Sequence, residues 1–259
     1  MKYSFSYIVE IQFLGFRFHG WQKQKNAMSL HEIIDKTLGF VFKDEIFKSI
    51  GVGRTDSKVS SSQYCFQLFM HFEIEKAKFI ALFNKNSPQD IKAIEIKTVS
   101  TDFNIIQQNK VKEYHYYFSY GQKNHPYAAP FIVGFHDQLD IEQMKLGAKL
   151  FEGNHYFGHY CTKPSQRTIL TRTIESCVII ENDILRANFF PEKSFVLKVK
   201  GKGFLRYQIR LMMGSLVELG KGNISLNEIE DSLLESSNTK PLENIAPGSG
   251  LHLHGLNFL

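Results

Sequence analysis

The first 120 residues change repeatedly between two hydrophobic periods, and this order restricts the fold more than any other feature of the sequence. Apolar residues at helical spacing predict helices over residues 29–42 and 75–86. Alternating apolar and polar residues predict strands at about 3–13, 46–52, 64–72, 91–98 and 111–120. The resulting order, strand-helix-strand-strand-helix-strand, is that of a ferredoxin-like unit, in which helices cover one face of an antiparallel sheet. We therefore expect an α+β fold.

The second half repeats this layering. Residues 124–135 show neither period and contain two prolines and a glycine, which is typical of a crossover between halves. Helices are predicted over 141–153, over 204–220 and from Ser225, and strands at 172–181, 184–190, 194–201 and 251–259. The sequence therefore predicts two α/β halves, residues 1–123 and 124–259, with a cleft between them.

Composition excludes several classes of protein. With 43% apolar residues and 23 phenylalanines in 259 residues, the chain has enough core material without disulfides or a metal. The three cysteines are far apart, and the ten histidines show no metal-ligand spacing, so we expect no metal site. No segment resembles a signal peptide or an apolar run of about 20 residues, which favours a cytoplasmic protein without a membrane span. The net charge of +5 is compatible with a nucleic-acid partner.

A short turn between two predicted strands is the first candidate site. In the stretch "GVGRTD", Gly51 and Gly53 allow unusual backbone conformations, and Arg54 and Asp56 flank Thr55. An arginine beside a carboxylate favours its ionised form, and an ionised, oriented aspartate can act as a nucleophile or a base. A surface ion pair in a glycine-rich turn is the simpler interpretation, and the residue types alone favour it.

Two further segments combine aromatic and basic side chains. In "VKEYHYYF", Tyr114 and Tyr116 share one face of a strand, and an aromatic ring beside a carboxylate can stack on a nucleobase. In "VKGKGFLRYQIRLMMGSL", Arg206 and Arg210 are four residues apart, so on one helix they share a face that suits phosphates. Core packing for the tyrosines, and a solvated basic face for the helix, are the alternatives.

A loop near the N-terminus, "FLGFRFHGWQKQK", carries the chain's single tryptophan, Trp21, among basic residues that include Arg17 and Lys23. Aromatic and basic groups in one loop suit RNA, which is bound by stacking and by phosphate contacts. A packing role, in which Trp21 fastens the loop to the core, is equally compatible with the sequence.

Taken in order, these segments resemble the TruA family of tRNA pseudouridine synthases along nearly the whole chain. "FLGFRFHGWQKQ" is similar to the family's strand-loop ending in G-W-Q-x-Q, and "GVGRTDSKVSSSQYCFQLF" to its G-R-T-D turn. "KEYHYYF" resembles the second motif, a basic residue, any residue, then tyrosine. "GFLRYQIRLMMGSLVELGKG" and "APGSGLHLHGLNF" resemble the family's helix motif and its C-terminal segment.

The resemblance implies a function and a set of site residues. It implies isomerisation of uridine to pseudouridine in the anticodon stem-loop of tRNA, at positions 38–40, without a cofactor. It implies Asp56 as the catalytic aspartate, Arg210 as its partner, Tyr114 against the target base and Arg54 holding the base out of the stack. It also implies a homodimer of subunits built from two ferredoxin-like (RRM-like) halves with antiparallel sheets that flank a basic cleft. The expected tRNA-binding residues are Arg17, Trp21, Lys23, Lys58, Lys202 and Arg206.

The chain departs from the family pattern directly after Asp56. The family continues A-G-V-H-A, whereas this chain reads Ser57-Lys58-Val59-Ser60-Ser61, and Leu211 replaces the asparagine that often follows the helix arginine. These departures motivate an alternative, a non-catalytic or retargeted RNA-binding paralogue. A carboxylate-dependent hydrolase ranks last, because no second acidic residue lies near Asp56 in the sequence.

Overall fold

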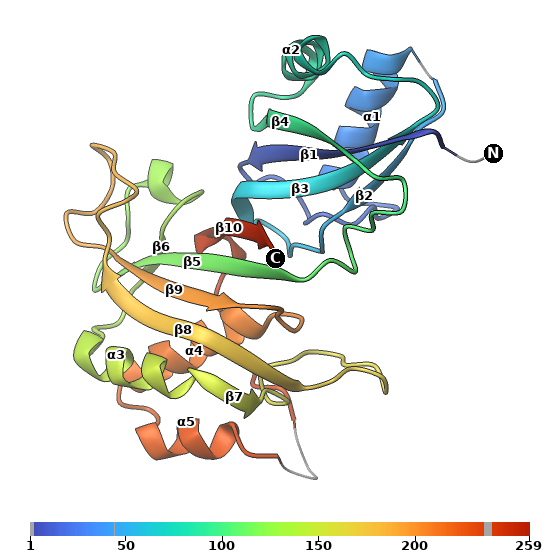
Figure 1. Cartoon of the computed structure of the whole chain (residues 1–259). Coiled ribbons are helices and arrows are strands. Elements are labelled where there is room, and N and C mark those ends of the chain that lie inside the picture. Colours follow the sequence, from blue (N-terminus) through green and yellow to red (C-terminus); the bar gives the residue numbers. More distant parts are fainter. Residues whose placement is uncertain (1–2, 44, 236–239) are drawn as a thin grey trace. The chain divides into compact units, whose positions relative to one another are not determined.

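The chain folds into two units, each with its own strands and helices (Figure 1). The computed structural model describes residues 3–43, 45–235 and 240–259. Unit 1 comprises Met1–Asn109 together with Leu253–Leu259, and unit 2 comprises Lys110–His252. The mixed α+β class predicted from the sequence is confirmed, since the strand pairs are mostly antiparallel in both units.

Unit 1 has the element order that the hydrophobic periods predict. Its strand order is β4-β1-β3, and β2 and β10 both lie beside β3. The β1–β3, β1–β4 and β2–β3 pairs are antiparallel. The elements are β1 (Phe5–Phe13), α1 (Leu30–Phe42), β2 (Lys48–Gly51), β3 (Ser60–Met70), α2 (Lys76–Asn86), β4 (Ile91–Val99) and β10 (Leu251–Phe258).

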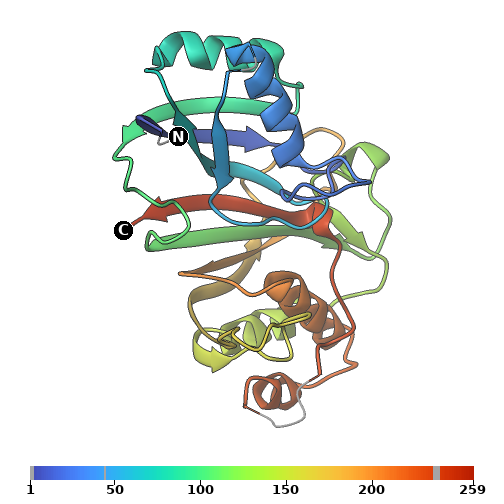
Figure 2. The ribbon, with the colours of Figure 1, turned by 90° about the vertical axis from the view of Figure 1, so that its right-hand side faces the viewer.

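Helices α1 and α2 lie on the same side of the unit 1 sheet (Figure 2). Ile34 and Leu38 of α1 and Phe79 and Phe83 of α2 are buried, which is the amphipathic pattern of helices that cover a sheet. The Ser29 hydroxyl accepts from the main-chain N–H of Glu32 and caps α1.

Unit 2 has a second, mainly antiparallel set of strands in the order β5-β9-β8-β7, with β6 parallel to β5. Helix α3 packs against β8 and against α4 and α5. The elements are β5 (Lys110–Tyr120), the 3-10 turn η1 (Pro126–Ala128), β6 (Val133–Phe135), α3 (Ile141–Leu150), β7 (Gly153–Tyr156), β8 (Thr171–Glu181), β9 (Phe195–Gly201), α4 (Gln208–Gly220), α5 (Leu226–Ser232) and η2 (Gly248–Gly250).

The strand predicted at 184–190 is wrong, because the side chain of Asn182 holds this segment as a loop. Its carboxamide oxygen accepts from the main-chain N–H groups of Ile184 and Leu185, and its nitrogen donates to the carbonyl of Leu185. A side chain that bonds its own neighbouring main chain competes with strand pairing. Phe190 turns inward and packs against the core.

The helix predicted over 204–220 begins four residues late, at Gln208. Tyr207 precedes it with a left-handed backbone (φ 63°), so Arg206 lies in the preceding turn. The prediction that Arg206 and Arg210 share a face of one helix is therefore wrong. Ile209, Met212 and Leu216 of α4 are buried and form the side of the helix that faces the core.

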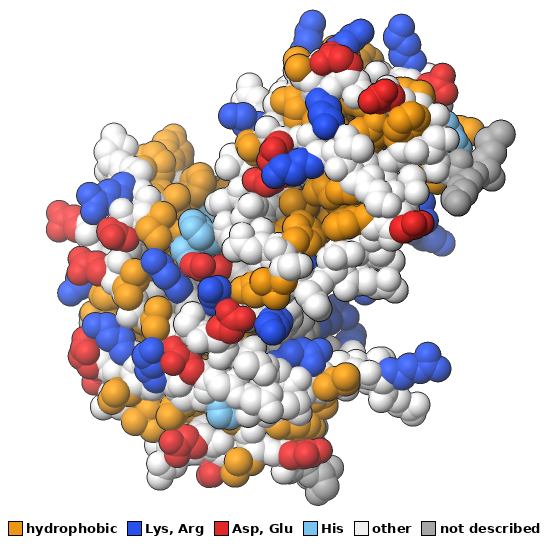
Figure 3. Space-filling view, in the orientation of Figure 1, with side chains coloured by type: hydrophobic (Ala, Val, Ile, Leu, Met, Phe, Trp, Pro, Cys, Tyr) orange, Lys and Arg blue, Asp and Glu red, His pale blue; other side chains and the backbone are white. Residues whose placement is uncertain are grey.

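Charges of both signs are interspersed on the face shown in Figure 3, so this face is not uniformly basic. Within the described residues, no helix has the length and apolar character needed to cross a membrane. The same residues contain no group of three or more His, Cys, Asp or Glu side chains placed to hold a metal ion. Cys65, Cys161 and Cys177 are buried free thiols.

Candidate active site

Asp56 lies in residues 52–59, the segment that joins β2 to β3, which we call the Asp56 turn. The side chain of Asp56 is half-buried, whereas Arg54 is exposed. The main chain of the N-terminal loop holds the turn from one side. The N–H of Trp21 donates to the carbonyl of Thr55 (3.2 Å), and the N–H of Lys58 donates to the carbonyl of Phe18 (3.0 Å). The carboxylate therefore stands on a turn that main-chain hydrogen bonds order.

A glycine in the N-terminal loop permits this close approach. Gly20 has a left-handed backbone (φ +84°), and a Cβ atom there would lie 2.3 Å from the carbonyl oxygen of Thr55. Because neither the conformation nor the space suits a larger residue, the G-W-Q segment and the Asp56 turn are one structural assembly. The sequence shows both segments but not this contact.

Two departures from the family pattern have a local structural account. Lys58 adopts a left-handed conformation (φ 66°), which glycine enters without strain and lysine only at a cost. Ser60 is buried, and its hydroxyl accepts from the main-chain N–H of Gly15 (2.9 Å). The substituted residues thus preserve an ordered turn.

Trp21 is buried beneath the Asp56 turn, with 3% of its surface exposed. Its ring stacks on His31 at 5.0 Å between centroids and lies 4.5 Å from the ring of Tyr64. The Tyr64 hydroxyl donates to the carbonyl of Gly53 (2.6 Å). This position favours the packing interpretation of Trp21, which fastens the N-terminal loop to the core.

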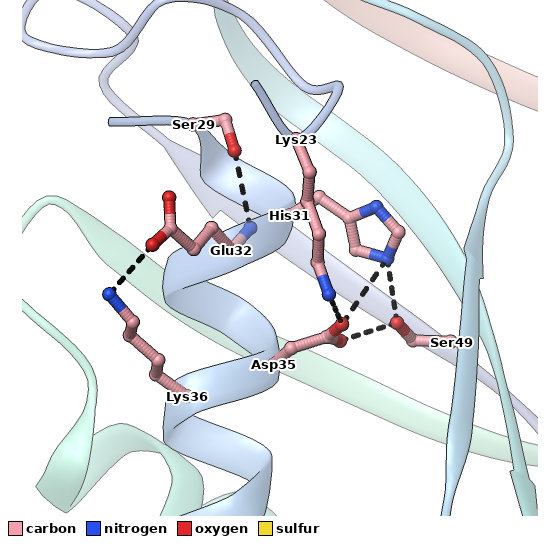
Figure 4. A network of polar contacts seen from close by, with 7 residues as sticks. All are labelled: Lys23, Ser29, His31, Glu32, Asp35, Lys36 and Ser49. Carbon is pink, nitrogen blue, oxygen red and sulfur yellow. Dashed lines mark hydrogen bonds and ion pairs between the residues drawn. The ribbon is translucent and has the colours of Figure 1, made fainter. Parts of the chain in front are cut away.

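Two of the predicted phosphate-binding cations of unit 1, Arg17 and Lys23, are engaged with carboxylates. Arg17 forms a bidentate ion pair with Asp90. Lys23 forms an ion pair with Asp35 (Figure 4). Both side chains are partly exposed, so an RNA phosphate would compete with an existing partner at each position. Lys58 is exposed and lies over the ring of Phe16.

Strand β5 in unit 2 carries Tyr114, which is nearly buried and meets the ring of Phe204 edge-on at 5.3 Å. Two residues along, on the same strand face, Tyr116 is fully buried and donates to the carbonyl of Pro247 (2.8 Å). Burial raises the pKa of Tyr116 far above its usual range, and the positive charge of Arg210 opposes this shift. Arg210, on α4, therefore lies near the Tyr116 hydroxyl.

Arg210 is held by the segment that follows α5. Its side-chain Nε donates to the carbonyl of Ala246 (2.6 Å), and its own carbonyl accepts from the N–H of Ala246 (3.1 Å). The guanidinium also lies over the ring of Tyr207 at 4.9 Å, and Arg206 lies over the same ring at 5.2 Å. The two arginines thus meet at one aromatic ring, although they do not share a helix. Arg206 and Lys202 are exposed.

The structure therefore groups the predicted residues within each unit. In unit 1 the Asp56 turn adjoins Trp21, and in unit 2 Arg210 lies near Tyr116, which shares a face of β5 with Tyr114, while Arg206 and Arg210 meet at the ring of Tyr207. The roles of Asp56, Tyr114, Arg210 and Arg54 stay predictions, as do those of the six expected tRNA contacts.

Sequence reasoning missed Lys112, which lies two residues before Tyr114 on β5. Burial, together with the smaller effect of the charge of Lys110, lowers the pKa of this lysine to about 8. The only signal in the sequence is a lysine at a strand position that shares a face with Tyr114. Tyr64 was also missed, because its hydroxyl partner is set by the tertiary contact with Gly53.

Comparison with known proteins gives a consistent set of relatives. The sequence profile of a family described as tRNA pseudouridine synthase matches residues 148–258. A tRNA pseudouridine synthase A of Listeria monocytogenes is 28% identical over 248 residues, which cover 96% of this chain and 97% of the relative. The tRNA pseudouridine synthase A of Exiguobacterium sibiricum is 28% identical over 243 residues, 94% of this chain and 92% of the relative. That of Streptococcus pneumoniae is 27% identical over 252 residues, 97% and 98% of the two chains.

Proposed function

We propose that the chain, as a TruA-like tRNA pseudouridine synthase and therefore an intramolecular isomerase, converts uridine to pseudouridine at positions 38–40 of tRNA. The observation that carries this proposal is the Asp56 turn. A half-buried aspartate stands on a turn that main-chain hydrogen bonds from the N-terminal loop hold in place. Order of this kind is what a reacting carboxylate needs, because misplacement by about 1 Å can cost about 10²-fold in rate.

The reaction is balanced without an oxidant, a reductant or a second substrate. The bond between the ribose C1′ and the uracil N1 breaks, the base turns, and C5 of the ring bonds to C1′. The proton on C5 is lost and N1 gains one, so the product is an isomer of the substrate. We assign Asp56 the role of nucleophile or base in the first step.

Tyr114 and Arg210 supply the remaining roles. Stacking on an aromatic ring contributes about 1–3 kcal/mol per base, and Tyr114 would keep the detached uracil from leaving before it turns. Arg210 would stabilise the charge of the carboxylate, since an unpaired carboxylate in a partly dry site is costly. Arg54, which is exposed, would occupy the place of the extruded base in the RNA stack.

We also propose the finer architecture that accompanies this function. Residues 1–123 and 124–259 would form two ferredoxin-like, RRM-like halves that flank a basic cleft, and two copies would form a cytoplasmic homodimer that binds tRNA. The β-α-β-β-α-β order of unit 1 and the pairing order β4-β1-β3-β2 support this proposal for the first half.

The decisive experiment uses unmodified tRNA carrying tritium at uracil C5. We expect tritium to be released in proportion to the pseudouridine formed. We also expect carbodiimide mapping to find the product at positions 38–40. Tight tRNA binding without tritium release would refute the catalytic proposal and support a non-catalytic paralogue. Release with the product mapped elsewhere would support a retargeted enzyme. The ordered turn around Lys58 and Ser60 supports an active enzyme rather than a non-catalytic paralogue.

Lys58 offers a separate test of the tRNA interface. Replacement by glycine removes one cation and suits the left-handed backbone, so the Asp56 turn is expected to persist. We expect log Kd for tRNA to depend less steeply on log salt, by about one unit of slope. Lys43→Gly is the matched control, because Lys43 is also exposed and left-handed (φ 53°) but ends α1. An equal change of slope in both variants would contradict a specific phosphate contact at Lys58.

A further inference from the structure

We propose that Tyr64 is a positioning residue, which fixes the Asp56 turn through its hydrogen bond to the carbonyl of Gly53. The proposal rests on the function proposed above and adds a residue that acts on the catalytic aspartate indirectly. Gly53 is three residues before Asp56, and the Tyr64 hydroxyl lies 2.6 Å from its carbonyl oxygen. Tyr64 itself is 1% exposed and belongs to β3, so its ring has little freedom to move.

The ring of Tyr64 is fixed by contact with the ring of Trp21, which in turn stacks on His31, and we call these three rings the column. The ring centroids of Trp21 and Tyr64 are 4.5 Å apart with the ring planes tilted by 32°, and those of Trp21 and His31 are 5.0 Å apart. The space beside the column is full, because a Cβ atom on Gly51 would lie 2.2 Å from the Tyr64 hydroxyl and 2.4 Å from the Trp21 ring. Close packing of this kind removes alternative positions for the hydroxyl.

A polar network holds the far end of the column (Figure 4). Ser49 donates to the carboxylate of Asp35, so its hydroxyl oxygen can only accept from Nε2 of His31 at 2.8 Å. His31 therefore carries its proton on Nε2, and its orientation is set by β2 and α1 together. Lys23 pairs with the same carboxylate, which links the N-terminal loop to the network.

The column and the main chain act on opposite ends of one short segment. Tyr64 holds Gly53, while the N–H of Trp21 holds the carbonyl of Thr55. Trp21 thus contributes its ring to one contact and its backbone to the other. The position of Asp56, directly after Thr55, is set by both, so loss of the Tyr64 hydroxyl is expected to loosen the turn without unfolding unit 1.

The test is the variant Tyr64→Phe, which removes the hydroxyl and keeps the ring in the column. We expect kcat for pseudouridine formation to fall by about 10-fold or more, with KM for tRNA within about two-fold. We also expect amide hydrogen exchange in peptides that cover 52–60 to accelerate by about five-fold, as follows when one hydrogen bond of about 1 kcal/mol is lost. Fluorescence of the single tryptophan, Trp21, is expected to stay unchanged, which shows that the column is intact.

Tyr7→Phe is the matched control. Tyr7 is also buried in unit 1, and its hydroxyl accepts from the main-chain N–H of Ile74 (2.9 Å), away from the Asp56 turn. We expect this variant to keep the wild-type kcat and the wild-type exchange in 52–60. A Tyr64→Phe variant with wild-type kcat and exchange overturns the proposal, as does an equal loss in both variants.

The two proposals fail separately in this experiment. If the wild-type chain releases no tritium, the proposed function is lost, and the exchange of 52–60 still decides whether Tyr64 orders the turn. If the wild-type chain is active and Tyr64→Phe is equally active, only the positioning role is lost.

Discussion

Replacing Asp56 by asparagine is expected to abolish pseudouridine formation, with a loss of on the order of 10⁴-fold or more in single-turnover rate. Asparagine has nearly the same shape but is a poor nucleophile and no base, so the main-chain contacts of the turn remain while the chemistry stops. Affinity for tRNA is expected to stay within a few-fold, because phosphate contacts supply most of it. Tritium release and a filter-binding titration with the same tRNA measure the two quantities.

The control for this prediction is Asp102→Asn, which removes one negative charge from an exposed position of unit 1. It is expected to change neither the rate nor the affinity. Product formation by Asp56→Asn at close to the wild-type rate would exclude Asp56 from the chemistry. A parallel loss of tRNA affinity would instead indicate that the turn had collapsed.

The second large effect is expected at Lys112, whose replacement by methionine should stabilise the protein. Burial lowers the pKa of this lysine to about 8, from a model-peptide value of 10.5. Holding the buried charge at pH 7 therefore costs up to about 3 kcal/mol of folding free energy. Methionine keeps the length and the apolar stem of the side chain and removes the charge.

The contribution of Lys112 to the free energy of unfolding depends on pH, and the direction of this dependence can be predicted. Between pH 8 and 10.5 the unfolded chain holds a proton that the folded chain has released, so the free energy of unfolding contributed by Lys112 rises with pH. In Lys112→Met this rise is expected to disappear. Denaturant titrations at pH 7 and at pH 10 measure it. Lys92→Met, at an exposed position of β4, is the control and is expected to show neither effect. A less stable Lys112→Met variant at pH 7 would contradict the prediction.

A lysine that lowers stability in this way is of interest because of its place on β5. Lys112 is two residues from Tyr114, on the strand face that also adjoins Arg210. Sites where function needs a buried charge commonly lower the stability of the folded protein. Measuring tritium release by Lys112→Met alongside its free energy of unfolding would show whether a gain in stability accompanies a loss of activity.

Several features of this protein follow from the sequence without any knowledge of the fold. The two hydrophobic periods predict most of the helices and strands, because the period of burial is a local property of the chain. The G-R-T-D stretch and its order relative to the other motifs predict the family, which the comparisons support. The cap of α1 at Ser29 is local in the same way, since the hydroxyl and its partner are only three residues apart.

Where local chemistry competes with the period, prediction failed. Residues 184–190 have the composition of a strand, but Asn182 bonds their main chain and keeps them in a loop. The helix that carries Arg210 was predicted to begin at Phe204, but the left-handed backbone of Tyr207 delays it. Neither a competing side-chain hydrogen bond nor a left-handed residue other than glycine changes the hydrophobic period.

The sequence by itself determined the order of the elements in unit 1, the class of fold and the identity of the aspartate at issue. Only the tertiary structure decided what surrounds that aspartate: the hydroxyl of Tyr64 on Gly53, the buried place of Trp21, and the left-handed backbone of Lys58. It also decided the depressed pKa of Lys112. The physical reason is that periodicity and capping depend on neighbours within a few residues, whereas hydrogen-bond partners and the dielectric surroundings of a charge depend on segments that the fold brings together from distant parts of the chain.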